Sequence, residues 1–185
     1  MKRGTKSLLF GVHQFLWHPF TVWRAWRKLY RRFPNRWECL AILCHDVGYW
    51  GKVSMDGSDG RQHPYEGALF GKRLARFLGA QECEAAYVES LILGHSRSFC
   101  EEEHKKLSDL CDPDKLSVLY DPAWFYWLRG TLSGEIEEYR EREEERQHQC
   151  IHSTREWLQG YRQKIRERYA EKTLCPLATD GGSRR

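Results

Sequence analysis

Apolar side chains recur every three or four residues along most of the chain, a spacing typical of amphipathic α-helices. The stripe in residues 19–33 begins at Pro19, a residue suited to a first helical turn, and ends before Pro34. It consists of Val22, Trp26, Leu29 and Phe33. Residues 36–45 have a broader apolar surface and are predicted to form a buried helix. The glycines between residues 48 and 62 predict a loop.

The helical pattern continues downstream of this loop. Further helices are predicted over residues 64–78, 82–93 and 107–120. The last of these carries Pro113, where we expect an interruption, and the glutamates at 101–103 predict an acidic loop before it. The aromatic run at 124–127 predicts a short packed helix. No segment alternates as a strand does, so we predict an all-α fold in which residues 1–133 form a compact bundle of about five to seven helices.

The chain changes character after residue 133. Residues 135–172 hold ten acidic and nine basic side chains, and their apolar positions are sparse. A seven-residue step links Ile151, Leu158 and Ile165. We predict a charged helical arm over 134–173, packed on the bundle or extending from it, whose narrow stripe would also suit association with a second copy. Residues 174–185 are expected to form a disordered tail.

Composition excludes several classes of protein. Apolar residues make up 41% of the 185 residues and charged residues 30%, which is typical of a folded domain and not of a disordered chain. The apolar stretches are far shorter than the roughly 20 residues that span a bilayer, so no membrane partner is expected. The seven cysteines form no C-x-x-C pair, and the N-terminus lacks the long apolar run of a signal peptide. These features favour a cytoplasmic protein with structural thiols.

The charge is distributed unevenly. Residues 1–37 carry nine lysines and arginines and no acidic residue. Such a segment can face the phosphate groups of a small substrate or of a nucleic acid, although it can equally be the solvated side of a helix. The chain also contains 8 Trp, 9 Tyr and 8 Phe, which suit a tight helical core and could add a stacking surface for a ligand.

The residues with the clearest chemical potential are His45 and Asp46, at the end of the predicted buried helix. Burying such a pair is costly unless it is neutralised or binds a metal ion. Other candidates lie at predicted helix ends or in a short acidic motif: His18, His63, His95 and Asp114. His13 is an alternative to His18, but its spacing from His45 is less natural. The remaining histidines, His104, His148 and His152, lie in highly charged segments and are expected at the surface.

The ordered set formed by His18, the His45-Asp46 pair and Asp114 resembles the HD superfamily of metal-dependent phosphohydrolases. Residues 18–22 are similar to the family's first motif, 42–48 (Ile-Leu-Cys-His-Asp-Val-Gly) to its namesake motif and 112–116 to its last motif. The resemblance covers about residues 12–130. The additional His63 and His95 are similar to the branch that holds two metals, such as bacterial diadenosine-tetraphosphate hydrolases.

The resemblance implies an HD-type bundle and a role for each candidate. His18, His45, Asp46 and Asp114 would hold a first divalent metal, and Asp46, His63 and His95 a second. Nitrogen and carboxylate ligands without a thiolate suit iron, manganese or a similar ion rather than a structural zinc. Asp46, Lys115 and Arg97 are the catalytic candidates, and Lys52, Arg97 and Lys115 would bind the substrate phosphate. Tyr49 stands where the deoxynucleotide-phosphatase branch has a glutamate, so the match to that branch is incomplete.

Two functions remain to be separated. The first is a phosphohydrolase (phosphatase, phosphodiesterase or nucleotide pyrophosphohydrolase) acting on a small phosphorylated substrate such as a nucleotide. The second is a helical interaction or nucleic-acid-binding module that uses residues 1–37, with a structural metal. Activity that vanishes with a chelator and returns with a divalent metal would favour the enzyme, whereas binding that weakens steeply with salt would favour the module.

Overall fold

The computed structural model describes residues 1–174, with side chains up to residue 170, and every regular element in this part is helical. Ten α-helices follow one another: α1 (Arg3–Phe10), α2 (Trp17–Tyr30), α3 (Arg36–Cys44), α4 (His63–Phe77), α5 (Glu82–Leu93), α6 (Arg97–Glu102), α7 (Cys111–Leu116), α8 (Ala123–Ser133), α9 (Glu135–Gln147) and α10 (Thr154–Leu174). Short 3₁₀ turns are η1 (Val47–Tyr49), η2 (Gly60–Gln62) and η3 (Ser117–Leu119). The prediction of an all-α fold is confirmed.

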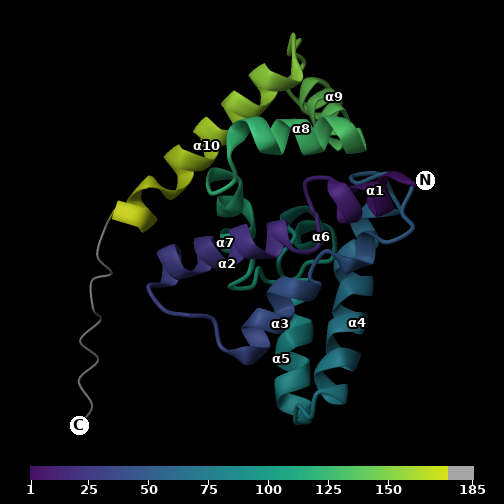
Figure 1. Ribbon diagram of the computed structural model, residues 1–185, viewed down its shortest axis with the longest axis vertical. Coiled ribbons are helices and arrows are strands. Elements are labelled where there is room, and N and C mark those ends of the chain that lie inside the picture. The colour runs from purple at the N-terminus through teal and green to yellow at the C-terminus, as the bar shows by residue number, and fades with distance from the viewer. Residues whose placement is uncertain (175–185) are drawn as a thin grey trace.

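Helix α2 lies between two hydrophobic cores. Its Val22 and Trp26 pack into a first core with α3, α4 and α5, and both side chains are 0% exposed. Its Ala25 and Leu29, which lie beside them on the same face, belong to a second core with α7, α8, α9 and α10. Figure 1 shows α2 crossing the molecule between the α4–α5 pair and the α8–α10 group. A helix whose buried face contributes to two cores is held firmly in place, and α2 carries His18 near its start.

The chain turn after α3 is pressed closely against the start of α4. Helix α3 begins with a capping box, in which the Asn35 side chain accepts hydrogen bonds from Trp37 N and Glu38 N. It ends at Cys44, and η1 then packs on α4. This approach requires a residue without a side chain, because a Cβ on Gly48 would lie 2.0 Å from the His63 backbone oxygen. Gly48 therefore allows the His45-Asp46 pair to lie next to His63.

The charged C-terminal segment folds back onto the bundle. Helices α8, α9 and α10 form a group at one end of the molecule in Figure 1. Leu158, Ile165 and Tyr169 of α10 are buried in the second core, and the Arg162 guanidinium donates to the backbone oxygens of Val118 and Asp121. All three positions of the seven-residue stripe thus pack against the chain's own core, with Ile151 partly buried and the other two buried.

Several predicted element boundaries need correction. Helix α2 ends at Tyr30 instead of residue 33, because Arg31 adopts a left-handed conformation with φ of 53°. Two of the three glutamates expected in a loop at 101–103 lie in α6. The helix expected over 107–120 starts only at Cys111, and Pro113 sits in its first turn, where a proline needs no interruption. The N-terminal helix α1 was not predicted.

Two further expectations concern packing and the C-terminus. Helix α8 forms over the aromatic run, but only Tyr126 of that run is buried, and Trp124 is 68% exposed. Within the described residues, no helix combines the length and the apolar character needed to cross a bilayer. A tail was expected over residues 174–185. Its first residue, Leu174, is the last residue of α10, and residues 175–185 lie outside the described part.

The close packing at Gly48 generates a test of the fold. Gly48→Ala should lower the free energy of unfolding by about 1–3 kcal/mol, because the added methyl group must push η1 away from the α4 backbone. Gly160→Ala in α10 is the matched control, since no atom lies within 4 Å of its added Cβ and alanine favours a helix. The free energies of unfolding of the two variants and of the unmodified chain are measured by denaturant unfolding of the metal-free proteins. Equal stability of Gly48→Ala and the unmodified chain would contradict the packing.

Candidate metal centre

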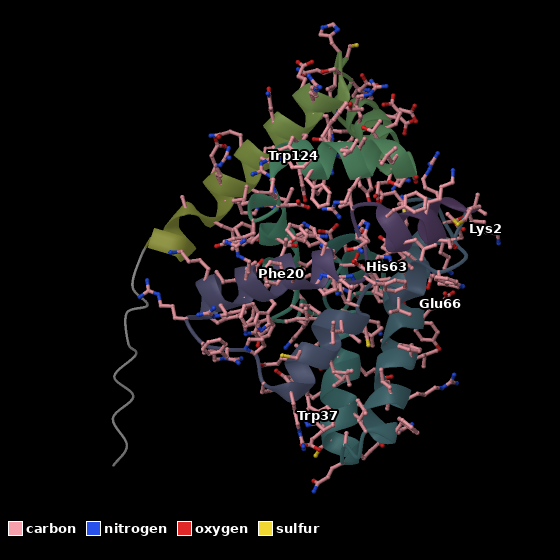
Figure 2. All side chains as sticks on the ribbon, viewed as in Figure 1. Lys2, Phe20, Trp37, His63, Glu66 and Trp124 are labelled. Atoms are coloured by element: carbon pink, nitrogen blue, oxygen red, sulfur yellow. The ribbon has the colours of Figure 1, made fainter. Side chains whose placement is uncertain are left out.

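Six ionisable residues from five helices meet at one buried point. His18 is the second residue of α2, His45 and Asp46 follow α3, and His63 is the first residue of α4. His95 follows the last turn of α5, and Asp114 lies in α7. All six are between 1% and 9% exposed. Figure 2 marks His63 in the interior, where α2, α3 and α4 approach one another. Helix ends thus bring together side chains that are up to 96 residues apart in sequence.

The first group surrounds one oxygen of Asp46. His18 Nε2 lies 3.2 Å from Asp46 Oδ2, 3.2 Å from Asp114 Oδ1 and 3.2 Å from His45 Nε2. His45 Nε2 lies 3.1 Å from the same Asp46 oxygen. This buried oxygen, Oδ2, accepts no hydrogen bond from any described residue. Four side chains therefore direct two nitrogens and two carboxylate oxygens at a common point.

The second group surrounds the other oxygen of Asp46. His95 Nε2 lies 3.6 Å from Asp46 Oδ1, and His63 Nε2 lies 3.8 Å from it. The two nitrogens are 3.1 Å apart. Ligand atoms of His18, His45 and Asp114, and likewise of His45, Asp46 and His95, lie within 4.8 Å of one another. These two sets share His45, and each could hold a metal ion; His63 belongs to neither set.

The protonation of His63 and His95 leaves two nitrogen lone pairs that face each other. His63 Nδ1 lies 2.8 Å from Gly60 O, and His95 Nδ1 lies 2.5 Å from Ile92 O. A carbonyl oxygen only accepts hydrogen bonds, so Nδ1 carries the proton in both rings. Burial lowers the pKa of both imidazoles, well below the ordinary value in His63, where the adjacent His95 adds to the effect. Both rings are therefore neutral, and their Nε2 lone pairs face each other.

The spacing of these nitrogens suits metal coordination. A nitrogen ligand lies about 2.1 Å from a divalent ion, so two such ligands at roughly 90–110° are about 3.0–3.4 Å apart. The separation between His63 and His95 falls within this range, as does that between His18 and His45. The backbone carbonyl behind each Nδ1 orients the ring, which is a usual arrangement for metal-binding histidines. His45 has the same arrangement, with Nδ1 2.8 Å from Ile42 O.

The two carboxylates give the first group a strong preference for positive charge. Although burial disfavours the charged ring, the adjacent Asp46 and Asp114 raise the pKa of His45 to about 10. Burial also opposes ionisation of the two acids, yet His45 for Asp46 and Lys115 for Asp114 hold the pKa of each carboxyl well below its usual range. A positive charge between the carboxylates is thus stabilised, whether an imidazolium or a metal ion carries it.

The three cationic candidates occupy different surroundings. Lys115 Nζ lies 2.9 Å from Asp114 Oδ2, the oxygen that faces away from His18, so it contacts a ligand directly. Arg97 donates to Asp112 Oδ1 and to the Tyr169 hydroxyl. Lys52 pairs with Glu66 Oε1 at 2.5 Å. Among the described residues, Lys115 is thus the one of these three cations that pairs with a candidate ligand of the centre.

Sequence reasoning underestimated two residues next to the centre. The His13 ring lies 5.3 Å from the ring of His18, and the Tyr49 ring stacks on His63 with a centroid separation of 3.8 Å. Tyr49, at the position where the deoxynucleotide-phosphatase branch has a glutamate, covers one side of His63. The position of His13 depends on contacts with a distant helix, which local spacing does not reveal.

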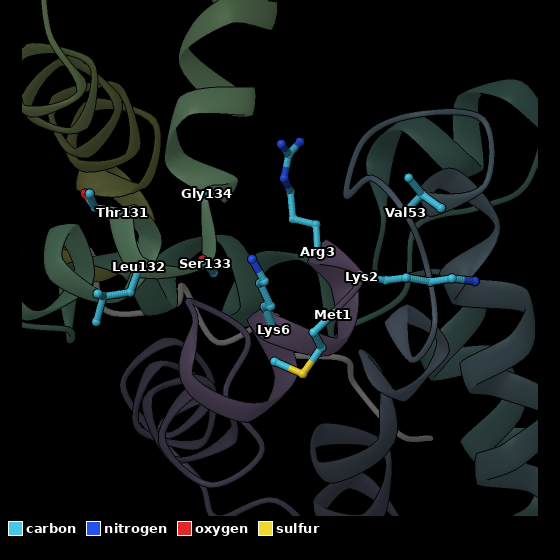
Figure 3. A pocket seen from close by; sticks show the side chains of 9 residues that line it. All are labelled: Met1, Lys2, Arg3, Lys6, Val53, Thr131, Leu132, Ser133 and Gly134. Carbon is cyan, nitrogen blue, oxygen red and sulfur yellow. The ribbon is translucent and has the colours of Figure 1, made fainter.

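The cavity that adjoins the centre is small, and more than half of its lining residues are apolar. A cavity of about 10 Å³, room for about one water molecule, is lined by His13, His18, His45 and Asp46 together with Leu8, Phe15, Pro19, Leu43 and Val47. A far larger shallow pocket of about 380 Å³ lies between α1 and the end of α8, with Lys2, Arg3 and Lys6 among its lining residues (Figure 3). Because none of the six residues of the centre lines the larger pocket, its size does not identify it as the entrance.

Comparisons with protein-family models, with curated proteins and with solved structures returned no significant match to this chain. The resemblance to the HD superfamily therefore depends on the ordered motifs of the sequence alone. The arrangement of the six side chains is an independent observation, and it supports metal binding without reference to any relative.

Metal content can separate the two groups. His63→Ala and His95→Ala should each lose about half of the bound metal, because only the second group uses these rings. Asp114→Ala should instead deplete the first group, and Asp46→Ala should deplete both. His152→Ala, an exposed histidine on the surface, is the control. Metal per chain is measured after dialysis against manganese and gel filtration; unchanged content in both His63→Ala and His95→Ala would reduce the centre to one ion.

Proposed function

We propose that this chain is a metal-dependent phosphohydrolase that acts on a small phosphate ester or phosphoanhydride, with nucleotides as the preferred class of substrate. The observation that carries the proposal is the position of Asp46, whose two oxygens serve two separate groups of histidines. Two divalent ions held in this way lower the pKa of a shared water and neutralise the oxygens of an in-line phosphoryl displacement.

The charge of the centre favours an anionic substrate. Asp46 and Asp114 supply two negative charges, and the four histidine ligands are neutral when they bind metal. Two divalent ions would therefore leave an excess of about two positive charges in a buried site. A phosphate group neutralises that excess, whereas a neutral ester does not. Lys115 adds a further positive charge, because Asp114 keeps its pKa above the ordinary value although burial opposes this.

The protein side chains also control access to the centre. Phe15, Pro19 and Val47 form apolar walls around the small cavity, and Leu43 at its edge is 52% exposed. Apolar walls limit the water that reaches the centre, and this strengthens the electrostatic interactions within it. The substrate would approach from the side of Leu43 and Phe15, where the chain connecting α1 and α2 faces the end of α3.

A second candidate function rests on the basic aromatic surface of α2. Arg27 lies over the rings of Trp23 and Phe33, at 5.0 and 4.2 Å from their centroids, and Arg24 lies 5.8 Å from that of Phe20. Phe20 and Phe33 are 45% and 64% exposed. Such a surface suits the stacked bases and phosphates of a single-stranded nucleic acid. Binding that falls steeply with salt and persists after chelation would favour this function.

The central prediction concerns Asp46. Asp46→Ala should reduce phosphate release to the background rate while the helical content stays unchanged, because the substitution removes the shared ligand and leaves the hydrophobic cores intact. Phosphate release from nucleotides and dinucleoside polyphosphates, with and without added manganese, measures the loss. The proposal would be wrong if Asp46→Ala retained full turnover at normal metal content.

A further prediction distinguishes Lys115 from Arg97. Lys115→Met should lower kcat/KM about ten- to a hundredfold, because the lysine holds the outer oxygen of the ligand Asp114. Arg97→Met tests the other cation, which is paired with Asp112. A loss of similar size would keep Arg97 among the phosphate-binding residues, and a normal kcat/KM would remove it from them.

A further inference from the structure

Two exposed apolar stripes lie on the outside of α1 and α8. On α8, Trp124, Leu128 and Leu132 follow one another at steps of four residues and are between 40% and 68% exposed. Side chains at this spacing lie on one face of a helix. At the end of α1, Leu9 and Phe10 are exposed as well. Monomeric proteins rarely leave large apolar side chains gathered in water, so these stripes indicate an interaction surface.

The two stripes belong to one surface, because α1 packs on α8 and the N-terminal segment runs antiparallel to that helix. Three contacts fix this direction: Arg3 Nε would lie 3.7 Å from a Cβ on Gly134, the Gly11 backbone oxygen accepts from Arg129, and the Trp17 ring lies 5.4 Å from that of Phe125. Leu132 is therefore beside the start of α1. Leu16, exposed and next to Trp17, is at the same end as Trp124.

Lysines without a partner border this apolar surface. The ammonium groups of Lys2 and Lys6, four positions apart, make no ion pair or hydrogen bond with any residue that the structure describes. Arg3 differs, since it is paired with Glu138. Together with Leu132, the two lysines line the shallow pocket of about 380 Å³ shown in Figure 3. Positive charge that the chain does not neutralise thus lies next to exposed apolar side chains.

We propose that this surface, called the α1–α8 face and made up of Lys2, Lys6 and the exposed apolar side chains of α1 and α8 named above, binds membranes that contain anionic phospholipids. The lysines contact the headgroup phosphates, and the Trp124 ring and the leucines enter the boundary between headgroups and acyl chains. The expectation of no membrane partner came from the lengths of the apolar stretches. Those lengths concern spanning helices only, and a protein that lies on the membrane surface needs none.

Charge and side-chain type favour a membrane over two other occupants. A second copy docked through the same face by two-fold symmetry would place unpaired lysines opposite the same lysines, which is unfavourable. A single-stranded nucleic acid needs aromatic rings on which bases stack. The exposed apolar side chains here are mostly leucines, and the basic aromatic surface of α2 suits that ligand better. An anionic membrane matches both the lysines and the leucines.

The α1–α8 face is distinct from the metal centre. None of the six candidate ligands belongs to it, and Leu8, on the buried side of α1, lines the small cavity that adjoins the centre. The inference therefore goes beyond the proposed hydrolysis and does not depend on it. Membrane binding is measured without added metal, so that failure of the proposed function leaves the test unaffected.

The test is sedimentation of the full chain with vesicles of phosphatidylcholine, either alone or mixed with phosphatidylserine, at low and at high salt. One variant combines Trp124→Ala with Leu132→Ser and so removes the apolar side chains at both ends of the α8 stripe. A second variant combines Lys2→Gln with Lys6→Gln and removes the unpaired charges. All four side chains lie at the surface or line the open pocket, so both variants should fold.

Each variant has a matched control elsewhere in the chain. Phe77→Ser removes an exposed apolar side chain at the end of α4, which lies at the opposite end of the molecule from α8 in Figure 1. The combination of Lys105→Gln with Lys106→Gln removes two exposed lysines that follow α6. The controls therefore change the same residue types without altering the α1–α8 face.

We expect the unmodified chain to sediment with vesicles that contain phosphatidylserine and not with phosphatidylcholine alone, and high salt should weaken this binding. Neutralising Lys2 and Lys6 should weaken the binding about tenfold or more. The variant of Trp124 and Leu132 should weaken it about tenfold or more at either salt concentration, because apolar side chains no longer enter the membrane. Both controls should bind like the unmodified chain.

Several results would overturn the inference. The unmodified chain would fail to bind the anionic vesicles, or the variant of Trp124 and Leu132 would bind them normally, which would indicate adsorption by charge alone. Equal loss in the controls would show that the α1–α8 face is not the contact. A single-stranded oligonucleotide that binds through Lys2 and Lys6, or a dimer that the variant of Trp124 and Leu132 dissociates, would give the face a different occupant in the absence of vesicle binding.

Discussion

The arrangement of the molecule depends on the burial of Asp46 with four histidines and a second aspartate. Asp46 is 7% exposed and its Oδ2 has no hydrogen-bond donor among the described residues, although it lies 3.1 and 3.2 Å from two imidazoles. Six polar side chains at one point would oppose folding in an apolar interior unless a compensating charge were present. A divalent cation bound between these side chains would supply that charge. The metal would therefore contribute to stability as well as to chemistry, because it binds the folded chain far better than the unfolded one.

The fold meets this constraint by placing the ligands at helix ends and the apolar residues along the helices. The buried face of helix α2 packs into both cores through Val22 and Ala25, yet its first turn presents His18. A helix end can redirect the chain within one or two residues, so His45 and Asp46 reach the same point even though adjacent residues in a continuous helix diverge. Gly48 then lets α4 approach closely enough to add His63. The rigid cores thus fix the ligands without contributing polar groups themselves.

Many of the helices and the six converging residues could be predicted from the sequence, because helical periodicity and helix ends are local features. Helical periodicity located α3 and α5 within a residue of their observed bounds, and histidines and aspartates next to helix ends identified the six residues that converge. The errors in the predicted helix boundaries also have local causes. Arg31 ends α2 early in a left-handed conformation, and a proline in a first turn does not interrupt α7. The short helix α1 buries a stripe of three residues, Gly4, Ser7 and Leu8, of which only Leu8 has a large apolar side chain, so apolar periodicity does not mark it. Its structure depends on what it packs against.

The contact between His13 Nδ1 and Glu135 Oε2, which are 3.0 Å apart, illustrates what local patterns cannot contain. His13 lies in no apolar helical stripe and has no favourable spacing from His45. Glu135 lies in a segment so rich in glutamate that composition does not distinguish it from its neighbours. Only the docking of α9 on the loop before α2 gives either residue its surroundings, with Ser7, Ser133 and the Val12 N–H all directed at one carboxylate. Metal ligands are constrained by direct bonds to one ion, so their order along the chain carries a signal. A residue that holds another in position can come from any element that packs there, so the tertiary structure is needed to find it.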